Sequence, residues 1–100
     1  MWWHHEDHTD DPVPTNVIIG RLQSGTPGVQ FTRKLLIGEC EDTVCCPTLE
    51  ALLETLRTFD PAEGLPHLAP AEVQASRARY RRRLPRLLAR ATAAWEEHLA

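Results

Sequence analysis

The last thirty residues place the strongest constraint on the fold, because their apolar side chains recur with the period of an α-helix. Pro70 suits the first turn of such a helix. Pro85 lies inside the pattern, where it removes one backbone hydrogen bond and crowds the carbonyl group of Arg81. The pattern therefore predicts a long C-terminal helix that is kinked near Pro85. Its apolar positions are Val73, Tyr80, Leu84, Leu87, Leu88, Ala91, Trp95 and Leu99.

Residues 47–59 carry a second helical pattern. Thr48 can cap the N-terminus, and Glu50 lies in the first turn, where the helix dipole favours an acid. The Pro- and Gly-rich residues 60–70 end this helix and connect it to the C-terminal one. The apolar stripe of the predicted helix consists of Leu49, Leu52, Leu53, Leu56 and Phe59.

Residues 16–38 predict a β-hairpin. The segment 16–22 is β-branched and apolar, and the segment 29–38 alternates between apolar and polar side chains, with Arg33 interrupting the apolar face. Residues 23–28 between them are rich in turn formers such as Gly and Pro. We expect the acidic residues 39–43 to form a turn, and residues 44–46 could add a short third strand.

A hairpin alone is marginal in water, so its apolar face must be buried against the helices. The sequence therefore predicts an α+β fold, in which an N-terminal β-hairpin or a three-stranded antiparallel sheet packs on one amphipathic helix and on the long kinked C-terminal helix. Residues 16–100 are expected to form one small domain. Residues 1–15, which are rich in His and acids and have no regular period, are expected to form a flexible arm.

Charge is unevenly divided along the chain. Residues 1–70 contain four basic and eleven acidic side chains, and residues 71–100 contain seven basic and three acidic ones, so the two parts carry net charges of −7 and +4. On a helical projection, Arg77 and Arg81 fall on the apolar side. The other five arginines share the opposite side, and none has an acidic residue three or four positions away. This predicted stripe consists of Arg79, Arg82, Arg83, Arg86 and Arg90.

Three interpretations of the predicted stripe are open. It is a solvated face screened by the protein's own acids, a surface for an acidic protein partner or a second copy of the chain, or a phosphate-binding surface for nucleic acid. The acidic remainder would repel a nucleic acid, and no DNA-reading module is recognisable. We therefore expect a protein partner or self-association, with Trp2 and Trp3 as aromatic anchors. A nucleic-acid-binding accessory or regulatory protein is the alternative.

Several side chains have the chemistry of metal ligands, namely His4, His8, Cys40, Cys45 and Cys46. The cysteine spacing differs from the paired Cys-x2-Cys of many zinc sites, and we expect the adjacent Cys45 and Cys46 to lie on opposite sides of a strand. No cofactor, metal or small-molecule substrate is therefore expected, and a metal- or thiol-based redox sensor is a further alternative. No sequence signature joins a cysteine nucleophile to a histidine base, so we expect no enzymatic activity.

The sequence also bears on location. It has no apolar run long enough to cross a membrane, and its N-terminus lacks the basic start and apolar core of a secretory signal. Three cysteines without a disulfide framework suit a reducing compartment. The sequence therefore predicts a small cytoplasmic adaptor or regulatory protein that binds a protein partner through its arginine-rich C-terminal helix and does not contact a membrane.

Overall fold

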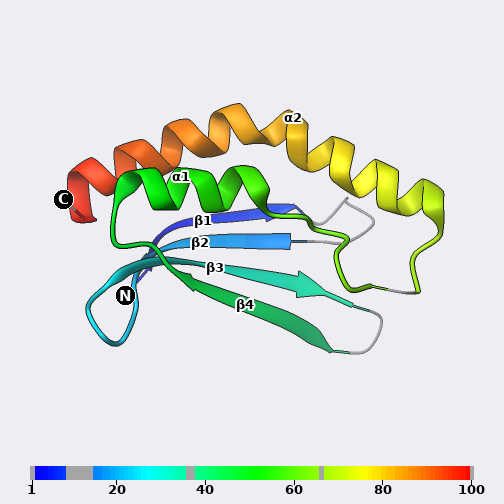
Figure 1. The fold of residues 1–100 in the computed structure, drawn as a ribbon, viewed down its shortest axis with the longest axis horizontal. Helices are drawn as coiled ribbons and strands as arrows, with labels where there is room; N and C mark the ends of the chain where they lie inside the picture. Colours follow the sequence, from blue (N-terminus) through cyan, green and yellow to red (C-terminus); the bar gives the residue numbers. More distant parts are fainter. Residues whose placement is uncertain (1, 9–14, 36–37, 66, 100) are drawn as a thin grey trace.

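The computed structural model describes residues 2–8, 15–35, 38–65 and 67–99, and for residues 2–8 it describes the backbone alone. Four strands form one antiparallel sheet in the order β1-β2-β3-β4, and both helices lie on the same face of that sheet (Figure 1). This arrangement confirms the predicted α+β fold with a long C-terminal helix. The elements are β1 (Trp2–His8), β2 (Thr15–Arg21), β3 (Pro27–Lys34), β4 (Glu39–Cys45), α1 (Leu49–Thr58), α2 (Pro70–Ala94) and the π-helical turn η1 (Trp95–Leu99).

The predicted hairpin is present as the antiparallel pair β2 and β3. Gly25 in the connecting turn has a φ of +88°, a conformation that glycine adopts without steric cost. β3 ends at Lys34, earlier than the alternation predicts. The reason is a turn in which the Leu35 N–H donates to the carbonyl oxygen of Gly38 over 3.0 Å.

Residues 39–45 form the edge strand β4, so the prediction of an acidic turn at residues 39–43 is wrong. β4 pairs antiparallel with β3, with Glu39 opposite Lys34 and Glu41 opposite Thr32. Both glutamates are exposed. Charged side chains are common on sheet edges because they discourage pairing with other chains. The third strand that the sequence allowed at residues 44–46 is therefore longer than expected and includes the acids.

The N-terminal residues Trp2–His8 form β1, which pairs antiparallel with β2, for example through His5 opposite Ile18. The prediction of a flexible arm is therefore wrong over this segment. Backbone hydrogen bonds along the edge of β2 require no apolar pattern in the added strand, which is why the polar sequence did not predict β1. Residues 1 and 9–14, the rest of the predicted arm, lie outside the described residues.

The core lies between the sheet and the two helices. Buried and more exposed residues alternate along β2, as expected for a sheet with one covered face. Phe31 of β3 stacks on Phe59 at the end of α1, with ring centroids 3.8 Å apart. The strands and helices contribute Val17, Ile19, Val29, Phe31, Leu52, Leu56, Tyr80, Leu87 and Ala91 to this core.

The starts of the two helices agree with the sequence, with α1 capped by Thr48 and α2 beginning at Pro70. The Thr48 Oγ1 accepts a hydrogen bond from the Ala51 N–H (3.1 Å), which confirms the predicted cap of α1. α2 runs without a break across Pro85 and follows a curved path over the sheet (Figure 1). In the described part of the chain, no helix combines the length and the apolar character that a membrane span needs.

Candidate functional site

Helix α2 carries most of the basic side chains, so its placement decides where they lie. At its start, the Glu72 carboxylate accepts a hydrogen bond from the Ala69 N–H (3.0 Å). In its middle, the buried Tyr80 hydroxyl donates to the carbonyl oxygen of Leu56 on α1. At its far end, the carbonyl oxygen of Leu99 in η1 accepts a bond from Arg21 of β2 (3.4 Å). These contacts fix which side of α2 faces the core.

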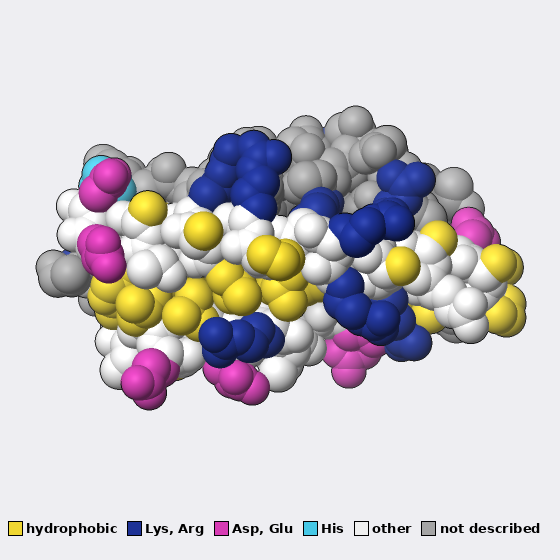
Figure 2. All heavy atoms as spheres, turned by 90° about the horizontal axis from the view of Figure 1, so that it is seen from above, with side chains coloured by type: hydrophobic (Ala, Val, Ile, Leu, Met, Phe, Trp, Pro, Cys, Tyr) yellow, Lys and Arg dark blue, Asp and Glu magenta, His cyan; other side chains and the backbone are white. Residues whose placement is uncertain are grey.

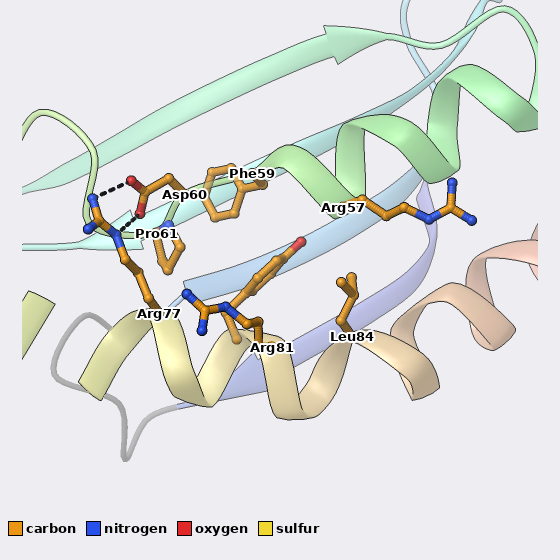
Figure 3. A pocket seen from close by; sticks show the side chains of 8 residues that line it. Arg57, Phe59, Asp60, Pro61, Arg77, Arg81 and Leu84 are labelled. Atoms are coloured by element: carbon orange, nitrogen blue, oxygen red, sulfur yellow. Dashed lines mark hydrogen bonds and ion pairs between the residues drawn. The ribbon is translucent and has the colours of Figure 1, made fainter. Parts of the chain in front are cut away.

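An ion pair joins α2 to the segment after α1. Arg77 donates from Nε to Asp60 Oδ1 (3.0 Å) and from Nη2 to Asp60 Oδ2 (2.7 Å), as drawn in Figure 3. This paired geometry is the strongest that a guanidinium group forms with a carboxylate. The hydrogen bond from Arg77 lowers the pKa of Asp60, with a smaller contribution from the Ala62 N–H, and burial opposes both. Asp60 is therefore held in its charged form.

The segment after α1 is in turn tied to the sheet by Arg33 of β3, whose side chain is only 7% exposed. Its guanidinium group donates to the carbonyl oxygens of Pro61 (3.2 Å) and Glu63 (2.8 Å) and to Asp42 Oδ2 on β4 (3.2 Å). A chain of contacts therefore runs from the sheet through residues 60–63 to α2. Sequence reasoning missed this role, although Arg33 gave the signal when it interrupted the apolar face of the strand.

The structure places the five arginines of the predicted stripe in two different environments. Arg82, Arg86 and Arg90 are exposed, and within the described residues none of the three forms an ion pair. They recur every four residues, so their attachment points follow one side of α2 over about 12 Å. We call these three residues the arginine row.

The other two members of the predicted stripe are placed differently. Arg79 and Arg83 are half-buried, and both engage partners within the chain. The Arg83 guanidinium group also lies 5.7 Å from the centre of the Tyr80 ring, a cation–π distance. The structure therefore gives Arg79 and Arg83 partners that the helical projection did not predict, because a projection gives the direction of a side chain and not what lies beside it.

Arg77 and Arg81, which the projection placed on the apolar side, line a hollow of about 240 Å³ between α1 and α2. Figure 3 shows Arg81 and Leu84 projecting from α2 towards this hollow, and Arg57 on α1 with its guanidinium group directed away from the Arg77–Asp60 pair. The lining contains three arginines and one acid. The apolar part of the lining consists of Phe59, Pro61, Tyr80 and Leu84.

The helix layer has an apolar surface beside its basic groups. Figure 2 views this layer from above and shows a stripe of hydrophobic side chains with basic side chains on both sides of it. Trp95 is half-buried and packs against the core, as its position on the apolar stripe predicted. The half-buried hydrophobic residues of the two helices that pack on the core include Leu49, Leu53, Leu84, Leu88 and Trp95.

The three cysteines differ in exposure and do not form a metal-binding group among the described residues. Cys45 is exposed and Cys46 is buried, which confirms that the pair lies on opposite sides of the strand end. Burial raises the pKa of the Cys46 thiol, so the reactive thiolate is disfavoured there. Cys40 is half-buried, with its sulfur 3.3 Å from a nitrogen of Arg33. Among the described residues, no group of three or more His, Cys, Asp or Glu side chains is arranged to hold a metal ion.

Other predicted site residues lie in β1, where the structure describes the backbone alone. These are the aromatic anchors Trp2 and Trp3 and the metal candidates His4 and His8. Comparison of the chain with protein-family models, with curated proteins and with solved structures finds no match. The candidate site is therefore the basic surface of α2, argued from its own chemistry.

Proposed function

We propose that this protein is a non-enzymatic adaptor or regulatory protein that binds an acidic protein segment through the arginine row. The observation that carries the proposal is the exposure of Arg82, Arg86 and Arg90 without an ion pair in the described part of the chain. A planar guanidinium group can donate two parallel hydrogen bonds to one carboxylate. Three such groups at four-residue spacing match carboxylates that recur along one side of a partner helix.

The surroundings of the row favour a protein partner over a nucleic acid. The apolar stripe and the hollow beside Leu84 offer hydrophobic area next to the arginines, a combination that is typical of protein interfaces. A nucleic acid would instead contact a row only about 12 Å long on a molecule with a net charge of −3. Acids in η1, which follows α2, would repel the nucleic-acid backbone, namely Glu96 and Glu97.

The proposal can be tested with two labelled probes, an acidic helical peptide and a DNA duplex of mixed sequence, followed by fluorescence anisotropy at increasing salt. We expect the peptide to bind and the R82Q/R86Q variant to bind it roughly tenfold more weakly, or about 0.7 kcal/mol for each lost charge pair. The matched control is K34E, which lowers the net charge by the same two units at an exposed position on β3 and should bind the peptide like the unaltered protein.

Two outcomes would overturn the proposal. If the duplex binds more tightly than the peptide, with a steeper dependence on salt that R82Q/R86Q reduces, the row is a nucleic-acid surface. If neither probe binds at low salt, or if R82Q/R86Q and K34E lose the same affinity, the row has no special role. We also propose a cytoplasmic location, on the ground that Cys40, Cys45 and Cys46 are all free thiols.

A further inference from the structure

A second surface, remote in sequence from the arginine row, lies along β4. β4 is the last strand of the sheet order and has β3 on one side. The Cys46 N–H donates to the carbonyl oxygen of Pro27 (2.8 Å). Along an antiparallel strand pair, every second residue forms such hydrogen bonds with the neighbouring strand, and the residues between them point the other way. The register therefore directs the backbone groups of Asp42 and Val44 towards β3. The backbone N–H and C=O groups of Glu41 and Thr43 point to the open edge.

A hollow of about 420 Å³ lies on the helix side of this edge. The stacked rings of Phe31 and Phe59 contribute to its lining, and Thr55 and Thr58 of α1 contribute hydroxyl groups. Val44 of β4 also lines it and is 36% exposed, the one large hydrophobic side chain classed as exposed among the described residues. An open strand edge, an exposed apolar side chain and a partly aromatic hollow therefore adjoin one another.

The charged side chains at this edge indicate what kind of segment can bind there. Three acids line the hollow, and two of them are already in ion pairs, Asp42 with Arg33 and Asp60 with Arg77. The third, Glu63, is exposed and forms no ion pair with another described residue. On the opposite face of the sheet, the exposed side chains of β4 include Glu39 and Glu41. A second copy of β4 would bring another Glu39, Glu41 and Asp42 to the same edge, and like charges are unfavourable wherever they lie opposite each other in a strand pair. The complementary occupant is an extended segment with basic side chains.

We propose that β4 binds an extended basic segment of a partner protein, which adds to the sheet as a fifth strand. Backbone hydrogen bonds to Glu41 and Thr43 supply the pairing, as in other cases of strand addition. One Lys or Arg side chain of the segment enters the hollow, with its methylene groups against Phe59 and its charge near Glu63. This surface is independent of the arginine row.

The test uses a labelled peptide of alternating Lys and Val residues and measures its affinity for the full chain by fluorescence anisotropy. Thr43→Pro removes the outward-pointing N–H without removing a bond to β3. We expect at least about tenfold weaker binding, as the loss of a backbone hydrogen bond together with its distorted neighbour implies. Thr43→Ala is the matched control, because it removes the same side chain, keeps the N–H and should leave the affinity unchanged.

A second measurement keeps the proposal testable if Thr43→Pro fails to fold. The same peptide with every backbone amide methylated has no N–H donor for an edge strand and should bind at least about tenfold more weakly. Glu63→Gln should weaken the Lys-containing peptide several-fold and leave a peptide with norleucine in place of Lys unaffected. R82Q/R86Q should bind the Lys–Val peptide normally, which separates this site from the arginine row.

The proposal is wrong if the Lys–Val peptide shows no binding up to about 1 mM at low salt. It is equally wrong if the methylated peptide binds as well as the unmodified one, or if a peptide with Glu in place of Lys binds as tightly. In the last case, attraction between the basic segment and the acids of β4 would play no part.

Discussion

The contacts of Arg33 lead to a prediction about how α2 is held on the sheet. Arg33→Met keeps most of the side-chain volume but donates no hydrogen bond. The carbonyl oxygens of Pro61 and Glu63 would then lose their donor, and each buried acceptor without a partner costs about 1–3 kcal/mol. The Asp42 carboxylate is 48% exposed, so water replaces most of what it loses.

The free energy of unfolding should therefore fall by about 2–4 kcal/mol, the lower part of the summed range, because the contact with Glu63 is only partly buried. For a domain with a total stability of about 5–15 kcal/mol this is a large fraction. Urea denaturation followed by circular dichroism measures it, and the midpoint should fall by about 2 M at a slope of about 1–2 kcal/mol per M.

Arg57→Met is the matched control, because Arg57 is 50% exposed and lies 3.8 Å from Glu54 in an ordinary surface pair. Its loss should change the stability by less than about 0.5 kcal/mol. If Arg33→Met changes the stability by no more than this control at an unchanged slope, Arg33 does not tie residues 60–63 to the sheet, and the chain of contacts to α2 is wrong.

Three further predictions concern the same scaffold and are checked by urea or thermal denaturation. Tyr80→Phe deletes a buried hydroxyl hydrogen bond and should cost about 1–2 kcal/mol, and an unchanged midpoint would contradict this. Because Arg77 lowers the pKa of Asp60 in the fold, this pair stabilises the protein above the ordinary pKa of 3.8 and the contribution is lost as the pH falls through the lowered value. Asp60→Asn should therefore be less stable than the unaltered protein at about pH 7, and this difference should shrink as the pH falls below 3.8, whereas a difference independent of pH would refute the assignment. Gly28→Ala would place a Cβ 2.7 Å from the carbonyl oxygen of Val44, so we expect a loss of about 1–3 kcal/mol, whereas full stability would show that β3 and β4 separate at little cost.

The sequence predicted those elements whose side chains carry a period. α1 and α2 follow from apolar stripes, and the hairpin follows from alternation around a glycine-rich turn. β1 could not be predicted in this way, because a strand added at an edge is held by backbone bonds that leave no side-chain pattern. The acids of β4 resembled a turn, since edge strands and turns both carry exposed charge.

The candidate site was predicted in part. The helical period placed Arg82, Arg86 and Arg90 away from the core, and the structure leaves them exposed. It could not show that Arg79 and Arg83 lie half-buried, because that depends on which other segments lie beside α2. The contacts of Arg33 were hidden for a related reason. They depend on the register between β3 and β4 and on the path of residues 60–63.

The measurement that tests the arginine row most directly is capture from an extract of the native host, comparing the unaltered protein with R82Q/R86Q and with K34E. We predict a set of acidic proteins that is retained by the unaltered protein and by K34E, is lost with R82Q/R86Q and survives nuclease treatment. The same proteins captured by all three baits, or a set that disappears with nuclease, would contradict a protein-binding role for the row.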